Sequence, residues 1–179
     1  GAKVVHIATF APEGASEPDL PAIAAGLGAD VPSQLSPALA LVRGAGERLE
    51  RLPDPAPHAV VLLPGGGGLG TAAVFAEAGR GAGELDSLAP RLREAAGSGA
   101  SPLEYAELLA NDLEPAARTL RPEIGDALDA LRAAGAPLAL MTGSGPTAFG
   151  LFPTLAEASR AAERLDRDDA IVCEASRAP

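Results

Sequence analysis

The chain has 179 residues, enough for one domain with an aliphatic core, and its formal net charge is -10 at pH 7. This excess of acidic residues repels a phosphate backbone and argues against a nucleic-acid partner. The single cysteine and the widely separated His6 and His58 provide no metal-ligand spacing, so we expect no metal site. Because no apolar run reaches the ~20 residues that span a bilayer, we expect a cytoplasmic protein without a membrane partner.

Residues 1–18 match no clear pattern beyond a short strand expected at 4–10 and a turn-rich connector after it. An N-cap at Asp19 and a periodic apolar face predict a helix over 19–27. Pro32 then biases the residue before it to an extended conformation. Asp30 is therefore expected at a helix-to-loop break, where its side chain can point into a cleft.

The middle of the chain predicts two short strands at 39–43 and 48–52, a hinge-like proline cluster, and an apolar strand at 59–63. Helices are expected at 71–78, 87–96, 101–110, 113–120 and 122–134. Ser101, Pro102 and Glu104 form a capping box with proline at the first helical position.

Two more strands are expected at 138–142 and 148–152, joined by a glycine-rich turn. Thr154 caps the next helix, whose expected apolar face is Leu155, Ala158, Ala162 and Leu165, and the last strand is expected at 170–174. From residue 59 onward the order is strand, helices, strand, strand, helix, strand. This order predicts an α+β fold of the ferredoxin-like type, with extra helices in the first crossover.

The segment from Gly65 to Gly70 contains a Gly-x-Gly-x-x-Gly match between a strand and a helix, as in dinucleotide-binding proteins. A nicotinamide-dependent dehydrogenase would return promptly to a parallel strand that ends in an acidic residue. Here a long helical stretch follows instead. A loop at the mouth of a cleft is the simpler interpretation.

The turn from Gly143 to Thr147 has two glycines that permit positive φ, so consecutive backbone N–H groups can converge on an anion. A plain hairpin turn is the alternative, and turn chemistry does not decide between them. Four other features also have simple structural interpretations. These are a cap for Asp30, a solvated turn for Glu47, a break between helices for Asn111-Asp112, and surface positions for Arg91, Arg93 and Arg118.

Four segments together resemble, in order and spacing, the diphosphocytidyl-methylerythritol kinases of the GHMP family. They are Leu27-Gly28-Ala29-Asp30-Val31-Pro32, Gly44-Ala45-Gly46-Glu47, Asn111-Asp112-Leu113-Glu114, and the run Met141-Thr142-Gly143-Ser144-Gly145-Pro146-Thr147-Ala148-Phe149-Gly150-Leu151-Phe152. The resemblance implies transfer of the ATP γ-phosphoryl group to a hydroxyl of the methylerythritol moiety, in the non-mevalonate route to isoprenoids. ATP, with Mg, is the implied cofactor.

The resemblance also implies residue roles. Asp30 matches the catalytic aspartate, and Gly143, Ser144, Gly145, Pro146 and Thr147 match a glycine turn near the phosphates. Gly68 and Thr71 fall in a loop that lines the cytidine side of the substrate cleft. Lys3 only faintly echoes the family's catalytic lysine, because Val5 stands where the family has asparagine.

The resemblance further implies three segments: a poorly matching 1–18, a remnant of the GHMP N-terminal lobe at 19–53 with the Asp30 motif, and a GHMP kinase C-terminal domain at 58–179. The family's glycine- and serine-rich ATP loop has no counterpart in residues 1–27. We therefore expect an incomplete chain that does not turn over ATP alone, with a missing N-terminal lobe as a partner. The alternative from another class is a non-catalytic ferredoxin-like module for binding or interaction.

Overall fold

The computed structural model describes residues 23, 26, 39–43, 48–79 and 85–175. The chain folds as two compact units, residues 1–37 with 42–49 and residues 38–41 with 50–179. Lys3, Asp30, Glu47 and the strand expected at 4–10 lie outside the described residues, and the three predicted segments stay a prediction. In the helix expected at 19–27, the two described residues, Ile23 and Gly26, are both helical.

The two short strands predicted before the proline cluster are confirmed. They are β1 (Ala40–Arg43) and β2 (Arg48–Arg51), which pair as a two-stranded sheet. The Leu52 N–H donates to the Leu39 carbonyl at 2.9 Å, which continues the pairing by one step.

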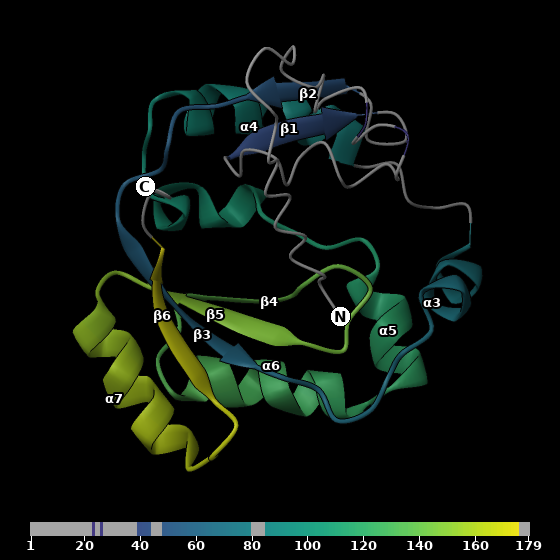
Figure 1. Cartoon of the computed structure of the whole chain (residues 1–179), viewed down its shortest axis with the longest axis vertical. Helices are drawn as coiled ribbons and strands as arrows, with labels where there is room; N and C mark the ends of the chain where they lie inside the picture. The colour runs from purple at the N-terminus through teal and green to yellow at the C-terminus, as the bar shows by residue number, and fades with distance from the viewer. Residues whose placement is uncertain (1–22, 24–25, 27–38, 44–47, 80–84, 176–179) are drawn as a thin grey trace, which may run out of the picture. The chain divides into compact units, whose positions relative to one another are not determined.

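A four-stranded antiparallel sheet is the centre of the larger unit (Figure 1). Its strands are β3 (His58–Leu63), β4 (Leu138–Met141), β5 (Ala148–Phe152) and β6 (Ile171–Ala175), in the order β4-β5-β3-β6. The chain passes from β3 to β4 with β5 between them, and from β5 to β6 with β3 between them. This topology confirms the ferredoxin-like prediction. Both neighbours of β3 are antiparallel to it, so the parallel unit of a dinucleotide-binding fold is absent from this sheet.

Six helices accompany the sheet in the described residues. They are α3 (Thr71–Ala78), α4 (Leu85–Gly97), the 3-10 helix η1 (Pro102–Leu108), α5 (Glu114–Leu120), α6 (Glu123–Ala133) and α7 (Leu155–Leu165). None of the described helices is long and apolar enough to cross a membrane.

The helix predicted at 101–110 is present as the 3-10 helix η1, which is kinked at Tyr105, where φ is -128° and ψ is 31°. The predicted capping box is present: Ser101 accepts from the Leu103 N–H, and Glu104 accepts from the Ser101 N–H. Tyr105 and Leu108 are both buried in a small cluster that includes Ala96 of α4.

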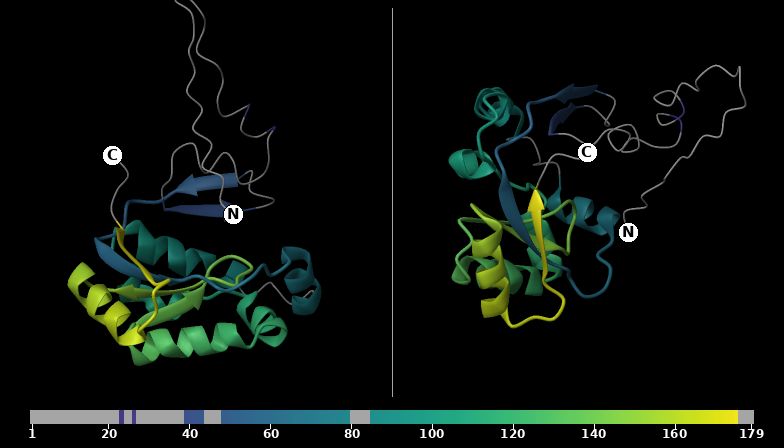
Figure 2. Two further views of the ribbon diagram at one scale, coloured as in Figure 1. Left: turned by 60° about the horizontal axis from the view of Figure 1, so that its bottom comes forward. Right: turned by 60° about the vertical axis from the view of Figure 1, so that its left-hand side comes forward.

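Helices α6 and α7 lie side by side on one face of the sheet, where they form the main core (Figure 2). Alternate residues of β3, namely Ala59, Val61 and Leu63, point into that core. Leu128 of α6 is fully buried there.

The predicted apolar face of α7 is partly wrong. Leu155 is 44% exposed, whereas Ala158 and Ala161 are fully buried. The face is centred on these small residues, and Leu155 in the first turn falls at its margin.

Candidate functional site

The glycine turn from Gly143 to Thr147 connects the edge strand β4 to β5. The Thr142 N–H donates to the Thr147 carbonyl at 2.9 Å, and the Gly145 N–H donates to the Thr142 carbonyl at 3.0 Å. Gly143 and Gly145 have φ of 57° and 82°, which disfavour any residue with a side chain. A Cβ on Gly145 would also lie 2.6 Å from the Met141 sulfur. This turn therefore requires its glycines for geometry, as the sequence indicated.

The glycine-rich loop between β3 and α3 meets this turn. Thr71 Oγ1 and Ser144 Oγ are hydrogen-bonded at 2.9 Å. At the other end of the loop, Gly65 is so close to Pro146 that a Cβ would lie 2.5 Å from the proline ring. Two segments far apart in the sequence thus form one structure, and the predicted residues Thr71 and 143–147 belong to it. A Cβ on Gly68 would have no neighbour within 4 Å, so that part of the loop is open.

Asn111 contacts the same turn from the segment before α5. Its Nδ2 donates to the carbonyls of Met141 and Gly143, at 2.7 and 2.8 Å. Its Oδ1 accepts from the Leu113 N–H at 2.9 Å. Sequence reasoning placed a break between helices here. The structure adds a direct link to the glycine turn.

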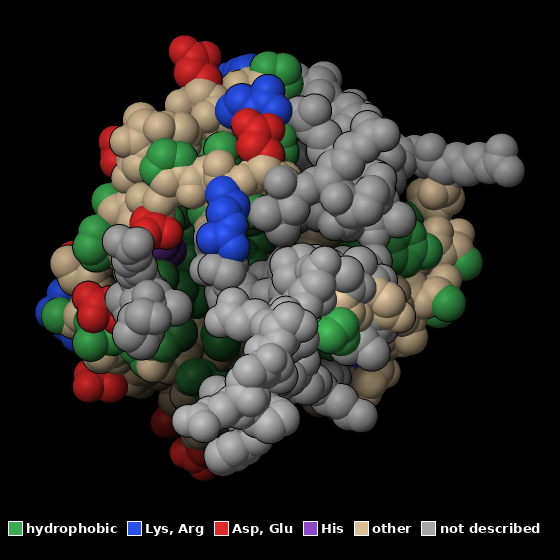
Figure 3. All heavy atoms as spheres, turned by 45° about the horizontal axis from the view of Figure 1, so that its top comes forward, with side chains coloured by type: hydrophobic (Ala, Val, Ile, Leu, Met, Phe, Trp, Pro, Cys, Tyr) green, Lys and Arg blue, Asp and Glu red, His purple; other side chains and the backbone are tan. Residues whose placement is uncertain are grey.

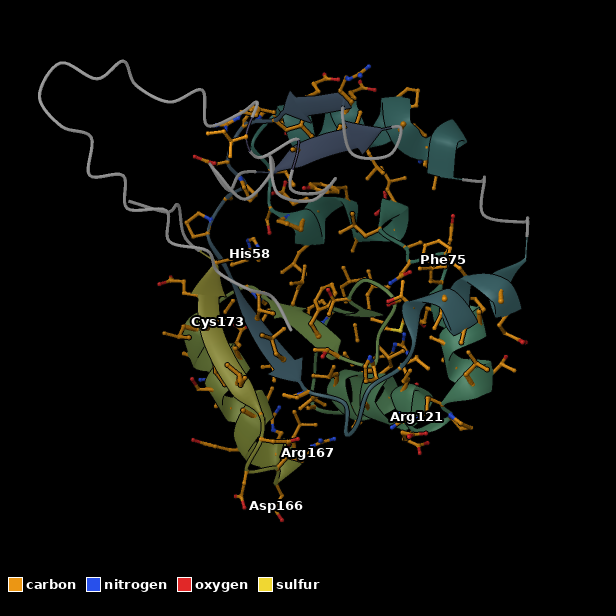
Figure 4. All side chains as sticks on the ribbon, turned by 45° about the vertical axis from the view of Figure 1, so that its right-hand side comes forward. His58, Phe75, Arg121, Asp166, Arg167 and Cys173 are labelled. Atoms are coloured by element: carbon orange, nitrogen blue, oxygen red, sulfur yellow. The ribbon has the colours of Figure 1, made fainter. Side chains whose placement is uncertain are left out.

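Behind the glycine loop lies a pocket of about 220 Å³. Leu63, Ile124 and Pro146 contribute apolar walls, and Arg121 and Arg167 contribute guanidinium groups. Figure 4 shows both arginines near the same end of the sheet. Sequence reasoning did not select either arginine. The sequence pattern showed only that each of these arginines follows the end of a helix, which does not predict a pocket.

Both pocket arginines are paired with acidic side chains. Arg121 donates to Glu123 and to the Gly66 carbonyl, and Arg167 forms two hydrogen bonds to Asp169, at 2.7 and 2.8 Å. The pKa of Glu123 is lowered by its own backbone N–H and then by Arg121. The hydrogen bond from Arg167 lowers the pKa of Asp169. Within each pair the acidic side chain balances the charge of the arginine, so the two arginines give the pocket no net positive charge.

None of the three arginines that the sequence placed at surface positions lines this pocket. Arg93 is paired with Glu50 at 2.5 Å, and Arg118 lies 3.8 Å from Glu114. Arg91 is an exposed residue of α4. In the described part of the face in Figure 3, basic side chains stand beside acidic ones and form no continuous basic patch.

The described residues leave two expectations untested. Asp30 lies outside them, so its position relative to the glycine turn stays a prediction. Among the described residues, no three His, Cys, Asp or Glu side chains converge in a group that could hold a metal ion.

Comparison with known proteins gives a consistent pattern. The family model for the C-terminal domain of GHMP kinases matches residues 82–170. The 4-diphosphocytidyl-2-C-methyl-D-erythritol kinase of Rhizobium leguminosarum is 42% identical over 146 residues, which cover 82% of this chain and 48% of the relative. The same enzyme of Streptomyces coelicolor is 44% identical over 137 residues, which cover 75% of this chain and 46% of the relative. The chain thus spans about half the length of these relatives.

Solved structures agree with the sequence matches. A crystal structure of 4-(cytidine 5'-diphospho)-2C-methyl-D-erythritol kinase has a TM-score of 0.68 and 34% identity, and the match covers 88% of this chain and 56% of that chain. The homoserine kinase of Cytophaga hutchinsonii has a TM-score of 0.58 at 19% identity, over 82% of this chain and 50% of that chain. The second likeness shows the fold alone.

Proposed function

Because the chain belongs to the GHMP kinase family through its C-terminal domain, we propose that it is part of an ATP-dependent kinase for 4-diphosphocytidyl-2-C-methyl-D-erythritol. The proposal takes its substrate from relatives that are about 40% identical. It draws on one structural observation, the Thr71–Ser144 hydrogen bond that brings the glycine loop and the glycine turn together. The family resemblance assigned the glycine loop to the substrate and the glycine turn to the phosphates, and this hydrogen bond makes them neighbours.

The glycine turn has a suitable geometry for holding a phosphate of ATP. The N–H groups of Gly143 and Ser144 have no acceptor among the described residues, so both are available to an anion. Backbone N–H groups bind phosphate oxygens well because the turn holds them fixed before the ligand arrives. Mg²⁺ is also implied by the family, but the described residues include no acidic cluster that fits it, so none of them is given that role.

Asp30 is the proposed catalytic residue. Its carboxylate would accept or orient the proton of the attacking hydroxyl. The hydroxyl oxygen forms a bond to the γ-phosphorus as the bond to the bridging oxygen breaks, and ADP leaves. Proximity of Asp30 to the glycine turn is a requirement of this proposal.

Phe75 is a further candidate for substrate contact that the sequence did not single out. It lies on α3 one helical turn after Thr71, and its side chain is 56% exposed (Figure 4). Residues four apart share a face of a helix, so Phe75 and Thr71 point to the same side. An exposed aromatic ring there suits the flat face of a cytosine base. Phe75→Ala is expected to weaken cytidine diphosphate binding, whereas Phe75→Tyr keeps the ring and is the matched control.

The test is a fusion of this chain to the half of the Rhizobium leguminosarum kinase that it does not match. Phosphoryl transfer is followed by ³¹P NMR, with ATP and either 4-diphosphocytidyl-2-C-methyl-D-erythritol or homoserine as the acceptor. We expect transfer to the former alone. Asp30→Asn in the same fusion should lower the rate by about 10²- to 10⁴-fold. A folded fusion that phosphorylates neither acceptor, or an active Asp30→Asn variant, would contradict the proposal.

A further inference from the structure

Met141 is the last residue of β4. This strand is at the edge of the sheet, so β5 can satisfy its backbone groups on one side only. Opposed residues in an antiparallel pair alternate between hydrogen-bonded and non-bonded. Thr142 is bonded to Thr147, so Met141 and Ala148 form a non-bonded pair. Met141 is only 2% exposed, and its backbone N–H and C=O therefore need partners other than water.

Two side chains supply these partners, one from the segment before α5 and one from the first residue of α5. Asn111 donates to the Met141 carbonyl at 2.7 Å, and Glu114 accepts from the Met141 N–H at 3.3 Å. Together they occupy the place that a neighbouring strand would take. We call Asn111 and Glu114 the edge clamp.

The edge clamp also reaches the glycine turn, because the same Asn111 Nδ2 donates to the Gly143 carbonyl at 2.8 Å. The Gly143 carbonyl and the Ser144 N–H belong to one planar trans peptide unit, so they point in opposite directions. A hydrogen bond that fixes the carbonyl therefore also fixes the N–H. Without it, the glycine at 143, which lacks a Cβ, would leave this peptide plane free to rotate.

We propose that Asn111 is a positioning residue: through the Gly143 carbonyl it aims the Ser144 N–H at the phosphate of the bound nucleotide. Its anchoring of the turn rests on the hydrogen bonds above, and its effect on the nucleotide rests on the proposed function. Asn111 acts through the turn and needs no contact with the nucleotide.

Asn111→Asp is the sharpest variant. It keeps an oxygen acceptor for the Leu113 N–H but replaces the donor with a carboxylate oxygen that faces two carbonyls. We expect hydrogen-exchange protection of the Thr142 and Gly145 amides to fall about tenfold at pH 7, and the Ser144 amide resonance to shift. The affinity for ADP, measured by titration of the fusion described under the proposed function, should fall in parallel.

Lowering the pH should reverse this loss. The two carbonyls disfavour the ionised form of the introduced carboxyl and raise its pKa, and the neighbouring Asp112 and Glu114 act in the same direction. Arg118, which is 3.8 Å from Glu114, opposes them. Once protonated, the carboxyl can donate to one carbonyl again. Protection factors, corrected for intrinsic exchange, should therefore recover between about pH 8 and about pH 5 in this variant and stay constant in the unmodified chain.

Two further variants keep the test decisive. Asn111→Ser retains a hydroxyl for the Leu113 N–H, cannot span both carbonyls, and should show the same loss of protection without the pH recovery. Thr154→Ala removes the cap of α7, which follows the end of β5 opposite to the turn, and should lower stability without changing the exchange of these amides. The proposal would be overturned if both Asn111 variants kept the original hydrogen-exchange protection of Thr142 and Gly145 and the original amide resonance of Ser144. If the amides change as expected but the fusion to the unmatched half of the Rhizobium leguminosarum kinase does not bind ADP, the anchoring is supported and the proposed function fails.

Discussion

Gly65 shows how a missing side chain allows two segments to touch. A Cβ there would lie 2.5 Å from the Pro146 ring and 2.8 Å from the Pro146 carbonyl oxygen. Gly65→Ala should therefore force the glycine loop from the turn and lower the free energy of unfolding by about 1–3 kcal/mol, measured by urea denaturation. Gly68→Ala is the matched control, since nothing lies within 4 Å of that position. Equal stabilities of the two variants would contradict this account.

Single residues were also where sequence reasoning reached its limit. The glycines at 143 and 145 could be predicted, because positive φ restricts the residue type. Asn111 and Arg121 could not. Asn111 acts through carbonyls that follow it by about thirty residues, and Arg121 contacts Gly66 from another loop. Such contacts produce no periodic pattern in the sequence, since they depend on which loops the topology brings together.

The first turn of α7 depends on one hydroxyl. Thr154 Oγ1 accepts from the Glu157 N–H at 3.2 Å, which satisfies one of the unpaired donors at the helix start. Thr154→Ala should lower the free energy of unfolding by about 1 kcal/mol. Thr154→Ser keeps the acceptor and should stay close to the original stability. Thermal unfolding of both variants provides the measurement, and a serine variant as unstable as the alanine variant would argue against capping.

Most helices and strands could be predicted because several local signals agreed. The helix at 71–78 and the strand at 148–152 were predicted with the observed bounds. Each lies between breaking residues and has a composition suited to its structure. The helix around Tyr105 was predicted but its kink was not, because Tyr105 packs in the cluster with Ala96, a contact that the local sequence does not contain.

Acid should weaken the whole molecule partly through two paired carboxylates. The folded-state pKa values of Glu123 and Asp169 lie below their ordinary values of 4.5 and 3.8. Their stabilising contribution is therefore complete above those ordinary values and is lost as the pH falls through the lowered ones. Glu123→Gln with Asp169→Asn should flatten the fall of Tm at acid pH. Both groups are exposed, so added salt should shrink the difference, and a salt-independent difference would contradict an electrostatic origin.

Alkali should weaken the molecule through Tyr105, whose burial raises its pKa above the ordinary value of 10.0, with Glu104 adding to the effect. The folded state keeps the phenol protonated where the unfolded chain releases the proton. Its contribution to stability is complete below pH 10.0 and is lost as the pH rises toward the raised folded-state pKa. Because the chain has one tyrosine, absorbance at about 295 nm follows this group alone. We expect its ionisation to occur above the ordinary range while the protein is folded. Tyr105→Phe should then reduce the alkaline loss of stability, whereas a tyrosine that titrates normally in the folded chain would place the ring in water rather than in the cluster with Ala96 and Leu108.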